Sequence, residues 1–288
     1  MIHQGFFMVV FNGKLYSDQE FFIGVGNTAL SFGHSVLEEI RIENGVVLFW
    51  EPHYLKIMAS MRMLRIHIPM SFTPDFLEEI IKDALSKTTL LKNNAIAVFQ
   101  AYPSEDNIAQ TDYHISFRPL ENLHLGQVSE TPFEIGLYKD FYIAHSLLST
   151  LPTNYKLVER LAGIFSDEND FQSCFLLNEK KEVIGTHLGP LFVVSNGQIQ
   201  TSPIDGGTQN SVFRKEILTL LSKDSEQEIS EETISPFSLQ KADALFIFNP
   251  SKGFISVSKY RKKVYEQHEF VQAIALKFQH SIQLKTPN

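Results

Sequence analysis

Runs of apolar residues separated by polar turns divide the first half of the chain into short strands and two helices. Alternating or continuous apolar stretches predict strands at residues 6–11, 14–16, 36–42, 46–49, 94–100 and 113–118. Apolar residues that recur at three- and four-residue steps predict helices at residues 52–65 and 73–86. Pro52 suits the first turn of the first helix, and Thr73 is placed to cap the second.

The second half repeats this mixture after a polar stretch at residues 119–130, which is typical of a linker. Strands are predicted at residues 134–138, 141–144, 175–177, 191–194, 199–201, 244–248 and 255–257. Helical spacing predicts helices at residues 157–165, 212–221 and 266–278, whereas the acidic residues 225–233 are expected to form a loop. The pattern therefore predicts an α+β protein of two domains, residues 1–118 and 131–288.

Composition narrows the class of protein. The chain has 288 residues, of which 43% are hydrophobic, and a formal net charge of −8. A chain of this length and hydrophobic content can bury hydrophobic cores. Its negative net charge argues against nucleic-acid binding, because nucleic-acid-binding proteins usually carry a basic face. A single cysteine, Cys174, excludes an internal disulfide and is typical of a reducing compartment. We therefore expect a cytoplasmic protein that binds no nucleic acid.

Two further kinds of function find no support in the sequence. No apolar run approaches the ~20 residues that a membrane helix needs, so no membrane association is expected. The ten histidines form no HxH or HExxH pattern, and the chain has no CxxC pair, so no metal site is expected.

A glycine-containing loop at residues 203–211 joins the predicted strands of the second domain to the helix predicted at 212–221. A loop that opens onto a helix N-terminus can hold a phosphate or a carboxylate, because free backbone N–H groups point outward there. The same geometry arises wherever a loop meets a helix, so an anion site and an ordinary connection both stay open.

The residue order around this loop resembles a known family. From Leu176 to Arg214 the chain reads LLN-x-x-x-x-V-x-G-x-x-x-x-x-LF-x-V-x-NG-x-x-x-T-x-P-x-x-x-G-x-x-x-x-V-x-R. This order is similar to the C-terminal domain of class IV pyridoxal-phosphate enzymes, which include branched-chain aminotransferases, D-amino-acid aminotransferases and aminodeoxychorismate lyases. The match extends from Asn12 to about Lys263. The resemblance implies a two-domain fold-type IV architecture like that of D-amino-acid aminotransferase, a homodimer, and a cofactor that lies between the domains.

The most important departure from the family concerns the lysine that holds the cofactor covalently. Anchoring the comparison on Asn154 places Leu151 at the lysine position, and counting back from Leu161 places Pro152 there; neither is an amine. Lys156 is the nearest amine, four or five positions further on. At the rise of an extended strand it would miss the expected place by roughly 13–16 Å, about twice the reach of its side chain.

The other positions that the resemblance assigns to the cofactor also depart from the family. They are Lys56, Gly185, Thr186, Ser211, Val212, Asn249 and Ser251. Gly185 stands where the family has a glutamate that binds the pyridine nitrogen, and Thr186 offers no fixed negative charge in its place. Lys56 stands where the family has an arginine that binds the phosphate, and Ser211 stands where the family usually has a glycine. Pro250, in the second phosphate-side loop, lacks an N–H donor.

Two functions remain open. The first is a non-catalytic, homodimeric member of the family that has lost transamination, binds a small anionic ligand in its interdomain cleft or serves as a partner subunit, and holds no covalent cofactor. The second is an active enzyme, either a pyridoxal-phosphate-dependent aminotransferase or lyase that uses Lys156, or one with unrelated chemistry. We expect the first, because losing the lysine removes both the covalent anchor and an acid–base group, and such a group typically contributes about 10²–10⁴ in rate. No residue of the chain is therefore assigned a catalytic role.

Overall fold

The computed structural model describes residues 8–17, 19–87, 94–121, 124–223, 228–266 and 268–285. The chain divides into two compact units, Met1–Leu123 with Pro152–Tyr155, and His124–Leu151 with Lys156–Asn288. The short segment Pro152–Tyr155 therefore belongs to the first unit although the residues on both sides of it belong to the second. The linker predicted at 119–130 and the domain limits predicted beside it stay predictions.

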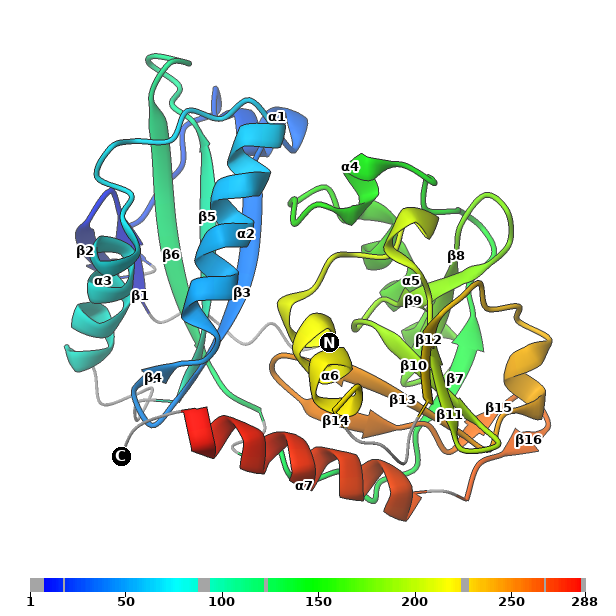
Figure 1. Ribbon diagram of the computed structural model, residues 1–288. Helices are drawn as coiled ribbons and strands as arrows, with labels where there is room; N and C mark the ends of the chain where they lie inside the picture. The colour runs from blue at the N-terminus through cyan, green and yellow to red at the C-terminus, as the bar shows by residue number, and fades with distance from the viewer. Residues whose placement is uncertain are drawn as a thin grey trace. The chain divides into compact units, whose positions relative to one another are not determined.

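The first unit is built on an antiparallel sheet of six strands in the order β2-β1-β6-β5-β3-β4 (Figure 1). The strands are β1 (Met8–Phe11), β2 (Lys14–Ser17), β3 (Val36–Glu43), β4 (Val46–Val47), β5 (Ala95–Pro103) and β6 (Thr111–Pro119). Two hairpins turn at Asn12-Gly13 and Asn44-Gly45, where all four residues have positive φ. This conformation matches the twist of antiparallel strands and favours asparagine followed by glycine.

Three helices accompany this sheet, namely α1 (Thr28–Phe32), α2 (Trp50–Met63) and α3 (Pro74–Ser86). Helices α2 and α3 cover one face of the sheet, and the core between them contains Ile57, Met61, Leu77, Ile81, Ile40, Phe99 and Ile115. The Thr73 hydroxyl caps α3 as expected, because it accepts a hydrogen bond from the Phe76 N–H at 3.2 Å.

Two of the predicted limits near α2 are wrong. The strand predicted at 46–49 ends at Val47, and the helix predicted from Pro52 begins at Trp50. Phe49 causes both differences, because its φ of +53° breaks the extended conformation and places the residue at the helix N-cap.

Helix α2 ends in a Schellman motif whose left-handed residue is Arg65. Its φ is +59°, its N–H donates to the Arg62 carbonyl at 3.2 Å, and the Ile66 N–H donates to the Met61 carbonyl at 2.9 Å. Met61 and Ile66 are both buried, which supplies the apolar contact usual in this motif. Glycine is favoured at such a position, because a side chain in the left-handed region costs roughly 1–2 kcal/mol.

The second unit contains two five-stranded sheets. Their orders are β12-β11-β10-β13-β14 and β16-β15-β7-β8-β9. The first comprises β10 (Leu191–Ser195), β11 (Gln198–Thr201), β12 (Glu228–Glu231), β13 (Ala244–Asn249) and β14 (Gly253–Ser256). The second comprises β7 (Glu134–Leu137), β8 (Ser173–Leu177), β9 (Val183–Thr186), β15 (Lys259–Tyr260) and β16 (Lys263–Val264).

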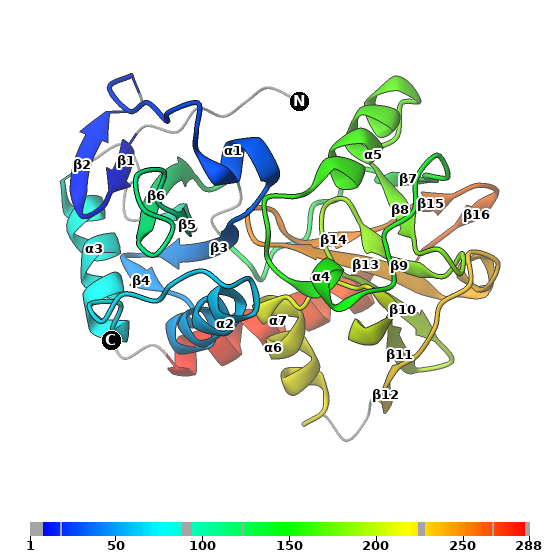
Figure 2. The same ribbon diagram turned by 90° about the horizontal axis from the view of Figure 1, so that it is seen from above.

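Four helices accompany the two sheets of the second unit. They are α4 (Leu147–Thr150), α5 (Leu157–Glu168), α6 (Val212–Leu221) and α7 (His268–Lys285), with short 3₁₀ turns at Ile204–Gly206 and Ser238–Lys241. Helix α5 packs against β8, as Figure 2 shows, and α7 packs against β13 and β14. Aromatic rings of Phe248, Phe254 and Phe278 form edge-on contacts between α7 and these strands. None of the helices in the described part of the chain could cross a membrane.

Two predictions for the second unit are wrong. Residues 141–144 form no strand, since only Ile143 makes a bridge there, to Asn178. The acidic stretch expected as a loop contains β12, which pairs in parallel with β11; residues 224–227 lie outside the described ranges. Residues 228–231 form a strand because β11 offers a partner, and the composition of these residues alone does not predict this pairing.

We predict that Arg65→Gly raises the free energy of unfolding by about 0.5–1 kcal/mol. The relieved strain exceeds the extra backbone entropy that glycine adds to the unfolded chain. Urea unfolding followed by tryptophan fluorescence reports on this unit, because Trp50 is the only tryptophan. The control, Arg62→Gly inside the helix, should lower stability by about 1 kcal/mol. A less stable Arg65→Gly variant would contradict the strain.

Candidate functional site

The chain segment at the family's lysine position is fixed to the edge of β3. Leu151 follows α4 in an extended conformation and is buried. The Pro152 carbonyl accepts a hydrogen bond from the Leu37 N–H at 2.7 Å, and Thr153 bridges Val36. The backbone is therefore held by the first unit, and neither residue that the two registers place here carries an amine.

Lys156 stands at the start of α5. It is the N-cap residue of that helix, and its side chain makes no capping hydrogen bond. Burial raises the pKa of Glu159 one turn further on, and the positive charge of Lys156 acts against that rise. Lys156 thus lies close enough to a carboxyl group of its own helix to interact with its charge.

The backbone at Gly185, in the strand that also carries Thr186, disfavours any side chain. Gly185 has φ of +143°, and a Cβ built on it would lie 3.2 Å from the carbonyl oxygen of Gly189. The Thr186 hydroxyl donates to that same oxygen at 3.0 Å and accepts the N–H groups of Leu188 and Gly189 at 3.2 Å. A side chain at Gly185 would be strained, and Thr186 is engaged in its own turn.

The N-terminus of α6 is capped from within the protein. The Ser211 hydroxyl accepts the Arg214 N–H at 3.4 Å, and the Ser211 N–H donates to the Gln209 carbonyl at 2.9 Å. The Asn210 N–H donates to the Thr150 carbonyl at 3.0 Å. Val212 is the first helical residue and is buried. Three of the N–H groups near this helix start therefore already have partners.

The turn between β13 and β14 is closed in the same way. The Asn249 side-chain oxygen accepts the N–H groups of Ser251 and Lys252, both at 3.0 Å. Its amide group donates to the Leu188 carbonyl at 2.8 Å. Pro250 has no N–H to offer. The backbone donors that could meet a phosphate here are bound to the turn's own asparagine.

These loops of the second unit lie close together. The Thr208 hydroxyl donates to the Ile184 carbonyl at 3.1 Å, which joins the loop before α6 to β9. A Cβ on Gly189 would lie 2.2 Å from the Phe248 carbonyl, so the turn after β9 touches the end of β13. These contacts join β9, which carries Gly185 and Thr186, to the loop before Ser211 and Val212 and to the end of β13, which leads into Asn249 and Ser251.

Lys56, the remaining predicted residue, lies on α2 in the first unit. Its Nζ is 2.8 Å from Oε2 of Glu38, whose Oε1 is 2.7 Å from Nδ1 of His53. The carboxylate and the imidazole are buried, and the Lys56 side chain is 12% exposed. Glu38 therefore compensates the positive charge of Lys56, which was expected to bind the phosphate of a ligand. The spacing of His53 and Lys56 on one helix face opposite β3 was the signal that could have revealed this.

The ionisation of Glu38 follows from this arrangement. Burial alone would raise the pKa of the carboxyl group, because it disfavours the charged form. The charge of Lys56 and the hydrogen bond from His53 outweigh burial and lower the pKa to about 2. The Glu38 carboxylate is consequently ionised and bound on both oxygens across the range in which proteins work.

The described residues do not fit pyridoxal phosphate as the family's chemistry requires it. No amine stands at either candidate lysine position, and no carboxylate stands at Gly185. The N–H groups named above at α6 and at the β13–β14 turn are hydrogen-bonded internally. Within the described ranges, no group of three histidine, cysteine, aspartate or glutamate side chains could hold a metal ion.

Comparison with known proteins adds the evolutionary context. Residues 35–260 match the family model described as amino-transferase class IV. A putative branched-chain-amino-acid aminotransferase of Methanocaldococcus jannaschii is 22% identical over 275 residues, which cover 86% of each chain.

Solved structures confirm the predicted α+β, fold-type IV architecture. The branched-chain amino acid aminotransferase of Escherichia coli superimposes with a TM-score of 0.84 at 20% identity, over 99% of this chain and 97% of that one. The enzyme of Thermobaculum terrenum in its PLP form gives a TM-score of 0.81 at 15% identity, over 98% and 96%.

We predict that Glu38→Gln destabilises the first unit by about 3–5 kcal/mol at neutral pH, because it leaves the Lys56 charge without its carboxylate. The pKa of Glu38 in the folded protein lies below the ordinary value of 4.5, so ionised Glu38 stabilises the wild type above about pH 4.5, and this contribution is lost as the pH falls toward 2.

Urea unfolding of both proteins by Trp50 fluorescence from pH 7 to pH 3 measures the effect. The double variant Glu38→Gln/Lys56→Met is the control and should recover part of the lost stability. Equal pH slopes for the wild type and Glu38→Gln would show that Glu38 is not the titrating group.

Proposed function

We propose that this protein, which belongs to the class IV aminotransferase family, has lost pyridoxal-phosphate-dependent transamination and acts without catalysing it. The observation that carries the proposal is the segment from Leu151 to Thr153. It has no amine, and its backbone is tied to β3 by the bond from Leu37 to the Pro152 carbonyl. A lysine placed elsewhere, such as Lys156, would need this segment to be rebuilt.

The internal hydrogen bonds support the same conclusion. A cofactor phosphate is normally met by backbone N–H groups that have no other partner. Here the side chain of Asn249 takes two such groups, and neighbouring carbonyls take those of Asn210 and Ser211. Binding a phosphate would first have to break bonds that the folded protein already makes, and each costs on the order of 0.5–1.5 kcal/mol.

A small anion is the ligand class that we propose for this protein. Lys56 keeps a cationic group that is 12% exposed, even though Glu38 shares it. We also propose that the protein acts in the cytoplasm, which the single buried, free thiol of Cys174 supports.

We predict that purified protein mixed with pyridoxal phosphate and then dialysed shows no absorption band of a lysine-bound cofactor. After borohydride reduction, peptide mass spectrometry should find no label on Lys156, the amine of the alternative reading. Lys156→Met is the matched control and should give the same spectrum as the wild type. A stoichiometric band that borohydride fixes on Lys156, and that Lys156→Met removes, would establish the alternative: an active aminotransferase or lyase.

We propose that the protein is a homodimer, which exposed apolar side chains on the segment before and within α1 support. Phe22 is 84% exposed, Val25 is 90% exposed, and Phe32 is 79% exposed. Light scattering coupled to size-exclusion chromatography should give about twice the chain mass of 32.8 kDa. The Phe32→Asp variant should shift the mass toward that of one chain, and a monomeric wild type would refute this proposal.

A further inference from the structure

A short segment of the first unit, which we call the strap (residues 19–26), connects β2 to α1 (Figure 2). Most of its side chains are exposed. The exposed apolar ones are those of Phe22, Ile23 and Val25. A segment that buries so little apolar surface depends on few contacts. Two contacts with distant parts of the chain hold the strap in place, one through Phe21 and one through its two glycines.

The first contact is an aromatic cluster around Phe21. The centroid of its ring lies 5.4 Å from that of Phe11 on β1, 6.3 Å from that of Tyr16 on β2 and 5.5 Å from that of His114 on β6. The Phe21 ring thus packs against the His114 imidazole, and His114 is only 9% exposed. Opening the strap would remove this ring and give the imidazole access to water.

The second contact joins the strap to the loop between β5 and β6. One oxygen of the Glu105 carboxylate accepts the Gly26 N–H at 3.1 Å. A Cβ built on Gly24 or on Gly26 would clash with an oxygen of the same carboxylate. Both glycines therefore let the backbone of the strap lie directly against Glu105.

The imidazole of His114 has neutral neighbours. Its Nδ1 lies 3.4 Å from the hydroxyl oxygen of Tyr102, which also forms a hydrogen bond with the Asn27 side chain. Burial disfavours the charged imidazolium and lowers the pKa of His114 from its ordinary value of 6.5 to about 4. His114 is therefore uncharged at neutral pH while Phe21 covers it.

No opposite charge offsets the protonation of His114. Among the residues that the structure describes, no carboxylate forms an ion pair with it. Four charged groups on neighbouring segments have other partners, which are Asn12 for Asp112, Ser17 for Glu20, Gly26 for Glu105 and the Tyr16 ring for Lys14. A covered imidazolium would consequently be a desolvated charge without a counter-charge.

We propose that the strap is an acid-sensitive element of the first unit that opens when His114 is protonated. In the closed form Phe21 covers the neutral imidazole, and in the open form water and a proton reach it. Glu105 holds the other end of the strap and sets how often it opens at any pH. The inference goes beyond the loss of transamination and needs no dimer, so the tests of those two proposals can fail without affecting this one.

The direction of the pH effect follows from the two forms. An uncovered His114 has a pKa near the ordinary value of 6.5, whereas the covered one has a pKa of about 4. The open form therefore binds the proton more tightly, and acid favours opening. The closed form keeps its full stability above about pH 6.5 and loses it as the pH falls toward 4. By this linkage the ratio of open to closed forms rises by up to about 30-fold between pH 7.5 and pH 5.

Amide hydrogen exchange at the Gly26 N–H tests the proposal, because this N–H is bonded to Glu105 in the closed form. Protection factors are compared instead of rates, which removes the pH dependence of the exchange chemistry. We expect the Gly26 protection factor to be about 10–30-fold lower at pH 5 than at pH 7.5. At both pH values the Phe99 N–H in β5 should be protected at least about 10²-fold more strongly, so that exchange at Gly26 reports local opening.

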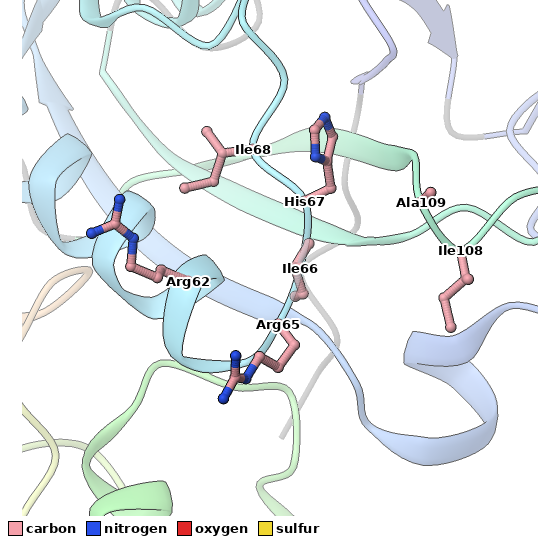
Figure 3. A pocket seen from close by; sticks show the side chains of 7 residues that line it. All are labelled: Arg62, Arg65, Ile66, His67, Ile68, Ile108 and Ala109. Atoms are coloured by element: carbon pink, nitrogen blue, oxygen red, sulfur yellow. The ribbon is translucent and has the colours of Figure 1, made fainter.

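Two variants that cannot titrate isolate the role of His114. His114→Phe keeps an aromatic ring beneath Phe21, and its Gly26 protection factor should change by less than about twofold between the two pH values. His114→Gln should behave in the same way. The matched control is His67→Phe, because His67 is an exposed histidine on the segment after α2 (Figure 3). This control should keep the decrease seen in the wild type.

The contact with Glu105 has a test of its own. Gly24→Ala places a Cβ against that carboxylate, so the Gly26 protection factor should fall at least about threefold at both pH values. The decrease between pH 7.5 and pH 5 should stay within about twofold of the wild-type decrease, because His114 is unchanged.

Three results would overturn the proposal. One is a wild-type decrease of less than about tenfold between the two pH values. Another is a decrease that persists in His114→Phe and His114→Gln, which would assign the pH effect to a different group. The third is unchanged protection in Gly24→Ala, which would show that Glu105 does not hold the strap.

Discussion

The ionised carboxylate of Glu38 is the interaction around which the first unit is organised. A buried charge must be paired and hydrogen-bonded, or its desolvation destabilises the fold. Glu38 lies on the central part of β3 and binds two side chains of α2, Lys56 and His53. Helix and sheet are thus fixed in one register, and the cation that the family frame would offer to a phosphate is held by a carboxylate.

The same requirement governs the second unit. Backbone N–H groups removed from bulk water need acceptors, and the chain supplies them itself. Asn249 closes the β13–β14 turn, and the carbonyls of Thr150 and Gln209 take N–H groups near the start of α6. The chain thus satisfies these N–H groups internally.

The C-terminal end of α2 departs from local conformational preference at Arg65. Most of the fold agrees with local preference, such as glycine in left-handed turns and threonine at the α3 cap. Arg65 does not, because it holds a conformation that favours glycine while its side chain stays exposed. Arg65 shares this combination of a positive φ and an exposed charged side chain with Lys181 and Arg261.

The sequence alone determined the fold class, most helices and strands, and the family, because apolar periodicity and turn pairs such as Asn196-Gly197 depend on neighbours in the chain. It also showed that no amine stands at Leu151 or Pro152. Only the tertiary structure decided that Lys56 faces Glu38, that Asn249 closes its own turn, and that Glu228–Glu231 pairs with β11. In the first and third of these contacts the two partners lie on different elements. In the second, the contact depends on the conformation of the turn. Their spacing in the sequence carries little information about them, because packing and burial select the partner.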